Sequence, residues 1–447
     1  MDDKKKSLLE DYGAKPVPVE QRKGWFSIGI VYWGVAVCLP AFLVSGLVAG
    51  SASLGTAIGA FLLASVILSA VAITTGIIGA GTKVSTGLSA KYTFGTYGSF
   101  ILQIVLFFAA WGWFGVQLGF MVEGLGDGGL AFIMGDAVPV WLLKIIGGIL
   151  MTITAMFGFK ALQKLSVVAI PLLLIMLVVT IISVYSGDTT LASVAGTAGP
   201  AAMPFGVAVS IVIGSFIMGA IIAPDVTRYA KDKKAGGLGM AFGMLVGFPV
   251  VLILASIMVK GAGGEVDFSK VMLGNQTGIW TFMAILAIIL AAWTTNDNNL
   301  YSGALAINAM FPKLSKWSIT VFSGALGTIL ALAGINTAAG FQGFLGLLAI
   351  LIPPAAAVMA VDYFFVKDPA SRQYREGELA NLTELRVVPV ISWAVGIVFG
   401  FLVTNTSLTI TTITALDAII VSGVVYAVIS AVKGKKNVKP EEVKKSA

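Results

Sequence analysis

Uncharged apolar stretches of about 20 residues recur along the whole chain, and no other feature of the sequence constrains the fold as strongly. A helix of that length crosses the roughly 30 Å hydrocarbon layer of a lipid bilayer. Backbone polar groups find no water in that layer, so a spanning segment must satisfy its own hydrogen bonds, as a helix does. A transmembrane β-barrel would show short alternating segments instead. The pattern therefore predicts an all-α membrane protein.

The apolar stretches leave no room for a soluble domain between them. Only 11% of the residues are charged, against roughly 25% in soluble domains. We predict twelve transmembrane helices, at residues 25–50, 54–79, 98–122, 139–159, 165–186, 205–228, 236–260, 278–309, 317–334, 342–365, 387–405 and 413–433.

Lysine and arginine are strongly biased to one side of this topology. Only Lys144, Lys260 and Lys270 fall on the other side. By the positive-inside rule both termini are cytoplasmic, and the net charge of +7 reflects topology rather than a nucleic-acid partner. We expect a multi-pass monomer in the lipid bilayer of a bacterial inner membrane.

Residue types that would support enzyme chemistry are scarce. The chain has one cysteine and no histidine, which excludes an internal disulfide and a His-ligated metal. A membrane-embedded enzyme would need a nucleophile, a metal cluster or an acid pair, and the sequence shows no such constellation. We therefore expect a transporter without a cofactor other than a coupling ion; a channel, which needs no stoichiometric coupling, is the other alternative.

Glycine and proline interrupt two of the predicted spans. The first and the sixth span stand five spans apart, as equivalent helices of a five-plus-five inverted repeat would. Broken helices at matching positions indicate a binding site near the membrane midplane, although glycine and proline are also common in unbroken membrane helices. The interrupting residues are Gly34, Pro40, Gly46 and Gly50 in the first span and Gly214, Gly219 and Pro224 in the sixth.

The eighth span contains WTTNDNN (293–299), a polar run inside a hydrophobic helix. Polar groups there cost several kcal/mol each unless they face protein or water. The hydroxyls of Thr294 and Thr295 offer the oxygen ligands that Na⁺ prefers. The carboxamides of Asn296 and Asn299 can read the edge of an amide-containing ring. The alternative is a purely structural polar network between helices.

Two further residues are candidates for proton transfer or gating. Asp297 is ionisable inside a span, which suggests a function: a proton acceptor, a neighbour of the cation or a structural hydrogen-bond hub. Pro353, followed by a second proline, should bend the tenth span, which suits a moving gate or plain packing.

Aromatic residues in two spans could hold a planar ring. Trp113 and Gln117 lie four residues apart on one helical face, so the indole could stack on a ring whose edge the carboxamide reads. Ser215 and Phe216 occupy the expected break in the sixth span, where Phe216 could cover the second face of the ring. Ordinary packing is the alternative for both aromatics.

These segments together resemble the nucleobase:cation symporter-1 family, and within it the cytosine permease and purine–cytosine permease branch. The resemblance covers nearly the whole region that contains the spans. It is carried by RKGW (22–25), STGLSAKYTFGTYGS (85–99), GWFGV (112–116), GSF (214–216), APDVTRYAKD (223–232), WTTNDNNLY (293–301) and IPPAAAVMAVDYF (352–364).

The resemblance implies a twelve-helix, five-plus-five inverted-repeat (LeuT-like) fold with broken helices 1 and 6 and alternating access. It also implies a ring held between Trp113 and Phe216, with its edge read by Gln117, Asn296 and the Ser215 region; we add Asn299 and Cys38 to the substrate-binding candidates. By similarity, sodium would be bound by backbone oxygens near Gly34 and Val37, the Ala291 backbone, and the hydroxyls of Thr294 and Thr295.

The sequence departs from the cytosine carriers at two positions. They resemble one another in having a glutamine where this chain has Ala110, and a small polar residue where it has Met218. Gln117 follows Trp113 by one turn, as in the hydantoin-carrying members. A purine, uracil, a hydantoin-like ring or a thiamine-precursor pyrimidine therefore stays open beside cytosine.

We predict Na⁺-coupled import of a nucleobase-like heterocycle by alternating access. The alternative is a proton-coupled permease for a hydantoin- or allantoin-like compound or a thiamine-precursor pyrimidine. We divide the chain into a cytoplasmic tail (1–24), a ten-helix transport core (25–365), a loop with two additional helices (366–433) and a basic tail (434–447).

Overall fold

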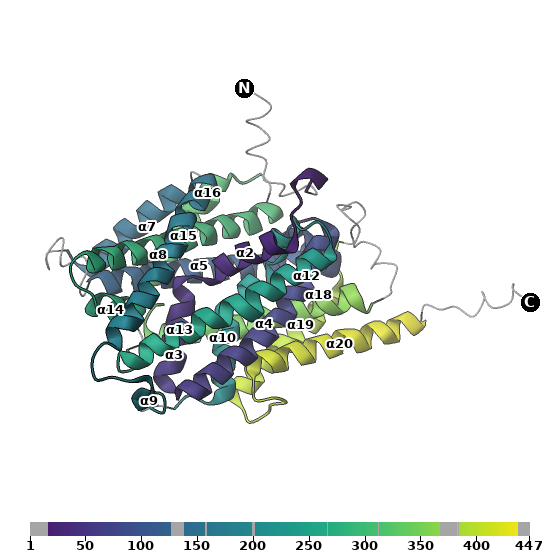
Figure 1. The fold of residues 1–447 in the computed structure, drawn as a ribbon. Coiled ribbons are helices and arrows are strands. Elements are labelled where there is room, and N and C mark those ends of the chain that lie inside the picture. Colours follow the sequence, from purple (N-terminus) through teal and green to yellow (C-terminus); the bar gives the residue numbers. More distant parts are fainter. Residues whose placement is uncertain are drawn as a thin grey trace, which may run out of the picture.

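The computed structural model describes residues 17–126, 138–156, 159–198, 202–265, 267–311, 313–366, 382 and 384–436. In these ranges the long helices lie alongside one another (Figure 1). The only bridge outside helices, among the described residues, joins Lys23 to Ala230. The elements are η1 (Val19–Gln21), α2 (Trp25–Ala36), α3 (Leu39–Ser51), α4 (Leu54–Thr82), α5 (Thr86–Gly126), α7 (Val140–Met156), α8 (Phe159–Val184), α9 (Leu191–Val194), α10 (Phe205–Ile221), α11 (Pro224–Thr227), α12 (Lys233–Phe242), the π-helical η3 (Gly243–Gly247), α13 (Phe248–Gly261), α14 (Phe268–Gly274), α15 (Ile279–Met310), α16 (Lys316–Leu332), α17 (Ala338–Leu351), α18 (Pro353–Phe364), α19 (Val387–Asn405) and α20 (Thr414–Lys436).

The helices are long and apolar enough for a multi-pass membrane protein. Over the described ranges, eight of them could each cross a bilayer, and a bent pair would make a ninth span. Three shorter apolar helices cover the predicted fourth, fifth and ninth spans. Every predicted span thus falls on a helix or on consecutive helices. How many of them cross the bilayer stays a prediction.

The first span consists of two helices, α2 and α3, that meet at 59°. Helical hydrogen bonding ends where the Val37 N–H donates to the Trp33 carbonyl, at 3.1 Å. Pro40 has no N–H, so the carbonyl of Ala36 has no donor four residues ahead. Cys38 is buried at the start of α3 with extended backbone angles. The chain therefore changes direction within an apolar stretch, next to the buried residues Val37 and Cys38.

The sixth span has no break at Ser215 and Phe216, so that prediction is wrong for this structure. The helix α10 runs without interruption through both residues and ends at Ile221. Its glycines instead leave space for neighbouring groups. A Cβ at Gly214 would collide with the Leu345 carbonyl of α17, and one at Gly219 would lie 2.7 Å from the Phe216 ring.

The tenth span divides at its proline pair. α17 ends at Leu351 and α18 begins at Pro353, although the two together still form one apolar stretch of 27 residues. A proline at the first position of a helix loses no intrahelical hydrogen bond. The polar segment 80–97 between the second and third predicted spans is mostly helical; Gly95, at φ +77°, marks the kink in α5.

The last two helices pack against each other and against α18. The Arg386 guanidinium binds the carboxylate of Asp362 through two hydrogen bonds of 2.9 Å. The hydroxyl of Tyr426 donates to the same carboxylate. Asp362 is fully buried. A charged group of α18 is thus compensated by the segment before α19 and by α20.

Candidate functional site

A cluster of buried carboxamides forms where α15 packs along α5. The Nε2 of Gln117 donates to the Oδ1 of Asn296 over 3.3 Å, and the Nδ2 of Asn299 donates to the same oxygen over 3.4 Å. The Nδ2 of Asn296 donates to the Phe114 carbonyl at 3.1 Å. Gln117 and Asn296 are fully buried, and Asn299 nearly so. Three of the predicted ring-reading residues therefore lie together.

The carboxamide cluster has one unused acceptor. The Oε1 atom of Gln117 is buried and accepts no hydrogen bond from any described residue. Buried polar atoms in folded proteins nearly always have a partner, so an exception calls for an explanation. A donor on a bound ligand would satisfy this oxygen.

The indole of Trp113 lies one turn before Gln117 and is 5% exposed. The rings of Phe341 and Phe344, both on α17, meet it edge to face at centroid distances of 6.2 and 5.3 Å. Gly112 lets α17 come this close, because a Cβ there would collide with the Phe344 ring. Sequence reasoning missed both phenylalanines, since no polar or helix-breaking signal marks them.

Phe216 lies in a separate aromatic group. Its ring contacts Phe248 at 4.8 Å and Tyr32 at 6.0 Å between centroids. Among the ring pairs of the described residues, it does not pair with Trp113. The hydroxyl of the neighbouring Ser215 donates to the Val212 carbonyl at 2.7 Å, within α10. The two aromatic side chains therefore make no direct ring contact, and a sandwich of Trp113 and Phe216 around a bound ring stays a prediction.

Three of the oxygens predicted to bind sodium lie within one helical turn. The hydroxyls of Thr294 and Thr295 donate to the Ala291 carbonyl over 3.3 and 2.8 Å. α15 contacts α3, the half of the first span that follows the break. Val37 is buried at the break, and Gly34 is half-buried one turn earlier. The side chain of Asn298 lies outside the described residues.

Asp297 points to a threonine of α7. Its Oδ1 accepts a hydrogen bond of 3.0 Å from the hydroxyl of Thr154. That hydroxyl oxygen accepts a 2.7 Å bond from the indole N–H of Trp293. Asp297 is only 2% exposed. Thr154 was not identified from the sequence, because a single threonine in an apolar helix gives no local signal.

An ionic cluster fixes the start of α17. The Nζ of Lys144 on α7 lies 2.7 Å from Glu123 Oε1 and donates to the Ala331 carbonyl at 3.0 Å. The carboxamide of Asn336 donates to the other Glu123 oxygen at 2.6 Å. Lys144 is buried. Because Asn336 lies two residues before α17, this cluster helps to position Phe341 and Phe344 against Trp113.

Two curated permeases are similar to most of the chain. Cytosine permease of Escherichia coli (strain K12) is 28% identical over 390 residues, which are 87% of this chain and 88% of that protein. Hydantoin permease of Microbacterium maritypicum is 26% identical over 382 residues, which are 81% and 77% of the two chains.

Among solved structures, the fold is similar to that of Mhp1, described as a nucleobase-cation-symport-1 family transporter. The closed conformation with bromovinylhydantoin bound superposes with a TM-score of 0.77 at 22% identity, covering 96% of both chains. The inward-facing conformation gives a TM-score of 0.80 at 20% identity, covering 96% of this chain and 94% of that one.

The family model for permeases of cytosine/purines, uracil, thiamine and allantoin matches residues 16–428. That range contains every candidate residue discussed above. The chain therefore belongs to the nucleobase:cation symporter family of membrane permeases.

Proposed function

We propose that this protein imports a nucleobase-like heterocycle across a bacterial inner membrane, coupled to Na⁺ by alternating access. The observation that carries the proposal is the buried cluster of Gln117, Asn296 and Asn299 with its unpartnered oxygen, one turn from the Trp113 indole. Carboxamides supply donors and acceptors side by side, and an indole supplies a flat apolar surface. Together they suit a planar ring with an amide-like edge.

The relatives carry the names of cytosine and hydantoin permeases. Both compounds contain a nitrogen–carbonyl–nitrogen unit in a planar ring. We assign this unit to the carboxamide cluster: the Gln117 oxygen accepts from an N–H of the substrate, and the amide N–H groups of Asn296 or Asn299 turn to its carbonyl. The 3.3 Å contact between Gln117 and Asn296 stays in place and directs the Gln117 oxygen to the substrate.

Sodium binding is proposed at the junction of the first and eighth spans. The break after Ala36 leaves backbone carbonyls of the first span without helical partners. On the eighth span, the Ala291 carbonyl and the hydroxyls of Thr294 and Thr295 lie close together in the turn that leads to Asn296. A cation that draws these oxygens together would fix α15, and with it Asn296. The cation drives transport only if it binds the two access states with different affinity.

Replacing Trp113 by alanine tests the stacking surface. Stacking of a base on an aromatic side chain contributes about 1–3 kcal/mol, so the apparent affinity for the transported ring should fall between about fivefold and a hundredfold. A thermal-shift screen of purified protein against cytosine, uracil, adenine, hypoxanthine, hydantoin and allantoin, with and without Na⁺, identifies the ring and measures the loss.

Trp317→Ala is the matched control, because the side chain of Trp317 is 62% exposed at the start of α16. It should leave ligand binding unchanged. Equal ligand-induced shifts in Trp113→Ala and in the unsubstituted protein would refute the placement of the ring.

Proton coupling is the second candidate, and it is favoured by the buried carboxylate of Asp297 with its Thr154 partner. Asp297→Asn keeps the side-chain shape and removes the ionisable group. If sodium is the coupling ion, this variant should retain Na⁺-dependent uptake in proteoliposomes within about threefold. Only the hydrogen bond with Thr154 changes, from one with a charged acceptor to one with a neutral acceptor, and such a bond contributes about 1 kcal/mol.

Sodium-independent uptake by the unsubstituted protein, driven by a pH gradient and lost in Asp297→Asn, would establish the proton-coupled alternative. Asp188→Asn, which removes a carboxylate from the loop after α8, is the matched control and should behave like the unsubstituted protein in both gradients.

A further inference from the structure

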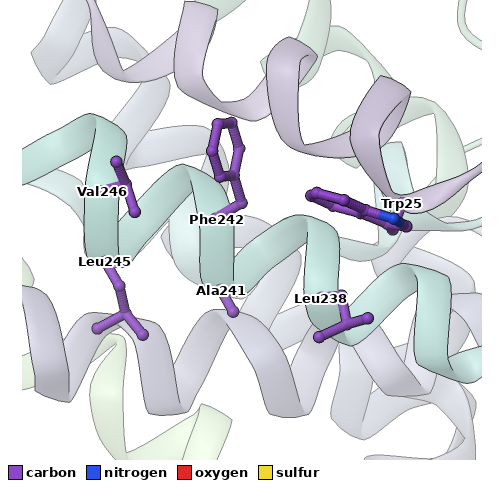
Figure 2. Close-up of a pocket in the computed structure, with 6 residues that line it drawn as sticks. All are labelled: Trp25, Leu238, Ala241, Phe242, Leu245 and Val246. Carbon is purple, nitrogen blue, oxygen red and sulfur yellow. The ribbon is translucent and has the colours of Figure 1, made fainter.

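An apolar groove lies on the outside of the helix bundle, away from the carboxamide cluster. Its volume is about 320 Å³, and it is lined by Trp25 of α2 and by Leu238, Ala241, Phe242, Leu245 and Val246 of α12 and η3. Figure 2 shows Leu238, Ala241 and Leu245 in one row along the helix, with Trp25 reaching across from α2. Trp25 and Leu238 are 43% and 45% exposed. On a membrane protein such a surface faces lipid.

Close helix packing and the π-helical turn give the groove its shape. Gly239 lets α2 approach α12, because a Cβ there would lie 2.7 Å from the Ile28 side chain and 3.0 Å from the Trp25 carbonyl. Leu245 and Val246 belong to η3, whose π-helical turn is wider than a regular helical turn. The Trp25 and Phe242 rings, 6.1 Å apart and nearly perpendicular, form one wall.

One end of the groove is positively charged. Lys234 is exposed one helical turn before Leu238, so it continues the row of lining residues. Exposed Lys23 stands two residues before Trp25, and its N–H donates to the Tyr229 carbonyl while its carbonyl accepts from the Lys231 N–H at 2.9 Å. These bonds bring the starts of α2 and α12 to the same end.

The three lysines Lys23, Lys231 and Lys234 outnumber Asp232 at this end of the groove. The carboxylate of Asp232 caps α12 by accepting from the Ala235 N–H at 2.6 Å. Lys233 turns away from the groove and lies over the Tyr363 ring, 5.2 Å from its centroid. Lys23, Lys231 and Lys234 are all exposed and lie in the segments that begin α2 and α12, at one end of the groove and on the side predicted to be cytoplasmic.

We propose that this groove binds an anionic phospholipid of the cytoplasmic leaflet, with an acyl chain along Leu238, Ala241 and Leu245 and the phosphate among the three lysines. Apolar lining over the length of the groove and cations at one end match the two parts of such a lipid. A soluble phosphate compound would gain nothing from the apolar part, and a zwitterionic lipid would gain little from the lysines.

Native mass spectrometry of the detergent-purified protein, titrated with phosphatidylglycerol or phosphatidylcholine, tests the proposal. A surface lysine contributes about 1 kcal/mol to binding anionic lipid, or roughly fivefold in affinity. With three lysines, the first bound phosphatidylglycerol should therefore bind about a hundredfold more tightly than phosphatidylcholine. The double variant Lys23→Gln/Lys234→Gln should lose roughly twentyfold of that affinity and keep its phosphatidylcholine binding.

A second variant fills the apolar part. Ala241→Phe should weaken the first binding event for both lipids, because its ring occupies the acyl-chain path. Matched controls are Lys313→Gln/Lys433→Gln, which removes two exposed lysines elsewhere, and Ala394→Phe on the exposed face of α19. Both controls should bind like the unsubstituted protein.

Three outcomes would overturn the assignment. The first is equal affinity for the two lipids. The second is an equal loss of phosphatidylglycerol affinity in the lysine controls, which would make the effect one of general surface charge. The third is displacement of phosphatidylglycerol by sn-glycerol 3-phosphate, which would make the lysines a site for soluble phosphate compounds.

Discussion

Replacement of Asn296 by leucine is expected to lower the apparent affinity for the transported ring about a hundredfold. Two hydrogen bonds to the substrate would be lost: the one from Asn296 itself and the one from Gln117, whose Nε2 is held by the Asn296 oxygen. Each net hydrogen bond contributes about 0.5–1.5 kcal/mol, so two are worth up to about 3 kcal/mol, or roughly a hundredfold. Radiolabelled uptake and ligand-induced thermal shifts measure the loss.

Asn308→Leu provides a matched control on the same helix. The Nδ2 of Asn308 donates to the Leu314 carbonyl at the exposed end of α15, far along the helix from Asn296. The control should keep the ligand affinity of the unsubstituted protein. An Asn296→Leu protein that folds and transports with normal affinity would show that the carboxamide cluster is a structural network only.

Thr295→Val is expected to raise the Na⁺ concentration for half-maximal uptake by at least tenfold, with little change in ring binding at saturating Na⁺. The substitution keeps the side-chain volume and removes one oxygen from the cluster around the Ala291 carbonyl. Interactions with a charged group contribute about 1.5–3 kcal/mol, which corresponds to a factor of roughly ten to a hundred. Uptake measured against external Na⁺ in proteoliposomes gives the shift.

Thr404→Val is the matched control for the sodium ligand. The hydroxyl of Thr404 donates to the carbonyl four residues earlier, at 3.0 Å, in the same way as Thr295. Because Thr404 lies on α19, away from the carboxamides, its loss should leave the Na⁺ dependence unchanged. The same Na⁺ curve for Thr295→Val as for the unsubstituted protein would remove Thr295 from the cation site.

The parts of the site that could be predicted are those with a strong local signal. Carboxamides are costly in an apolar helix, so the polar run marks Asn296 as a candidate. Gln117 was found from its spacing to Trp113, and the resemblance assigned both residues to the edge of one ring. The first-span break was visible for a similar reason, because Pro40 removes an N–H that no neighbour can replace. All-helical architecture followed from the length of the apolar stretches.

The parts that escaped prediction depend on which helices become neighbours. Thr154, Phe341 and Phe344 are ordinary residues of apolar helices, and only the packing of α7 and α17 brings them to Asp297 and Trp113. Glycine misled the sixth-span prediction because it permits both a broken helix and close contact. In α10 it provides the contact, so the helix runs on through Phe216.

The ion pair between Asp362 and Arg386 bears on how these permeases can be recombined. A chimera that takes α19 and α20 from a relative must keep both Arg386 and Tyr426. Otherwise the buried carboxylate of Asp362 loses its partners. Removing one partner of a buried pair typically costs about 3–5 kcal/mol, a large part of the stability of most domains. The segment of α19 and α20 therefore cannot be removed without cost, because it supplies the cation that pairs with Asp362 of α18.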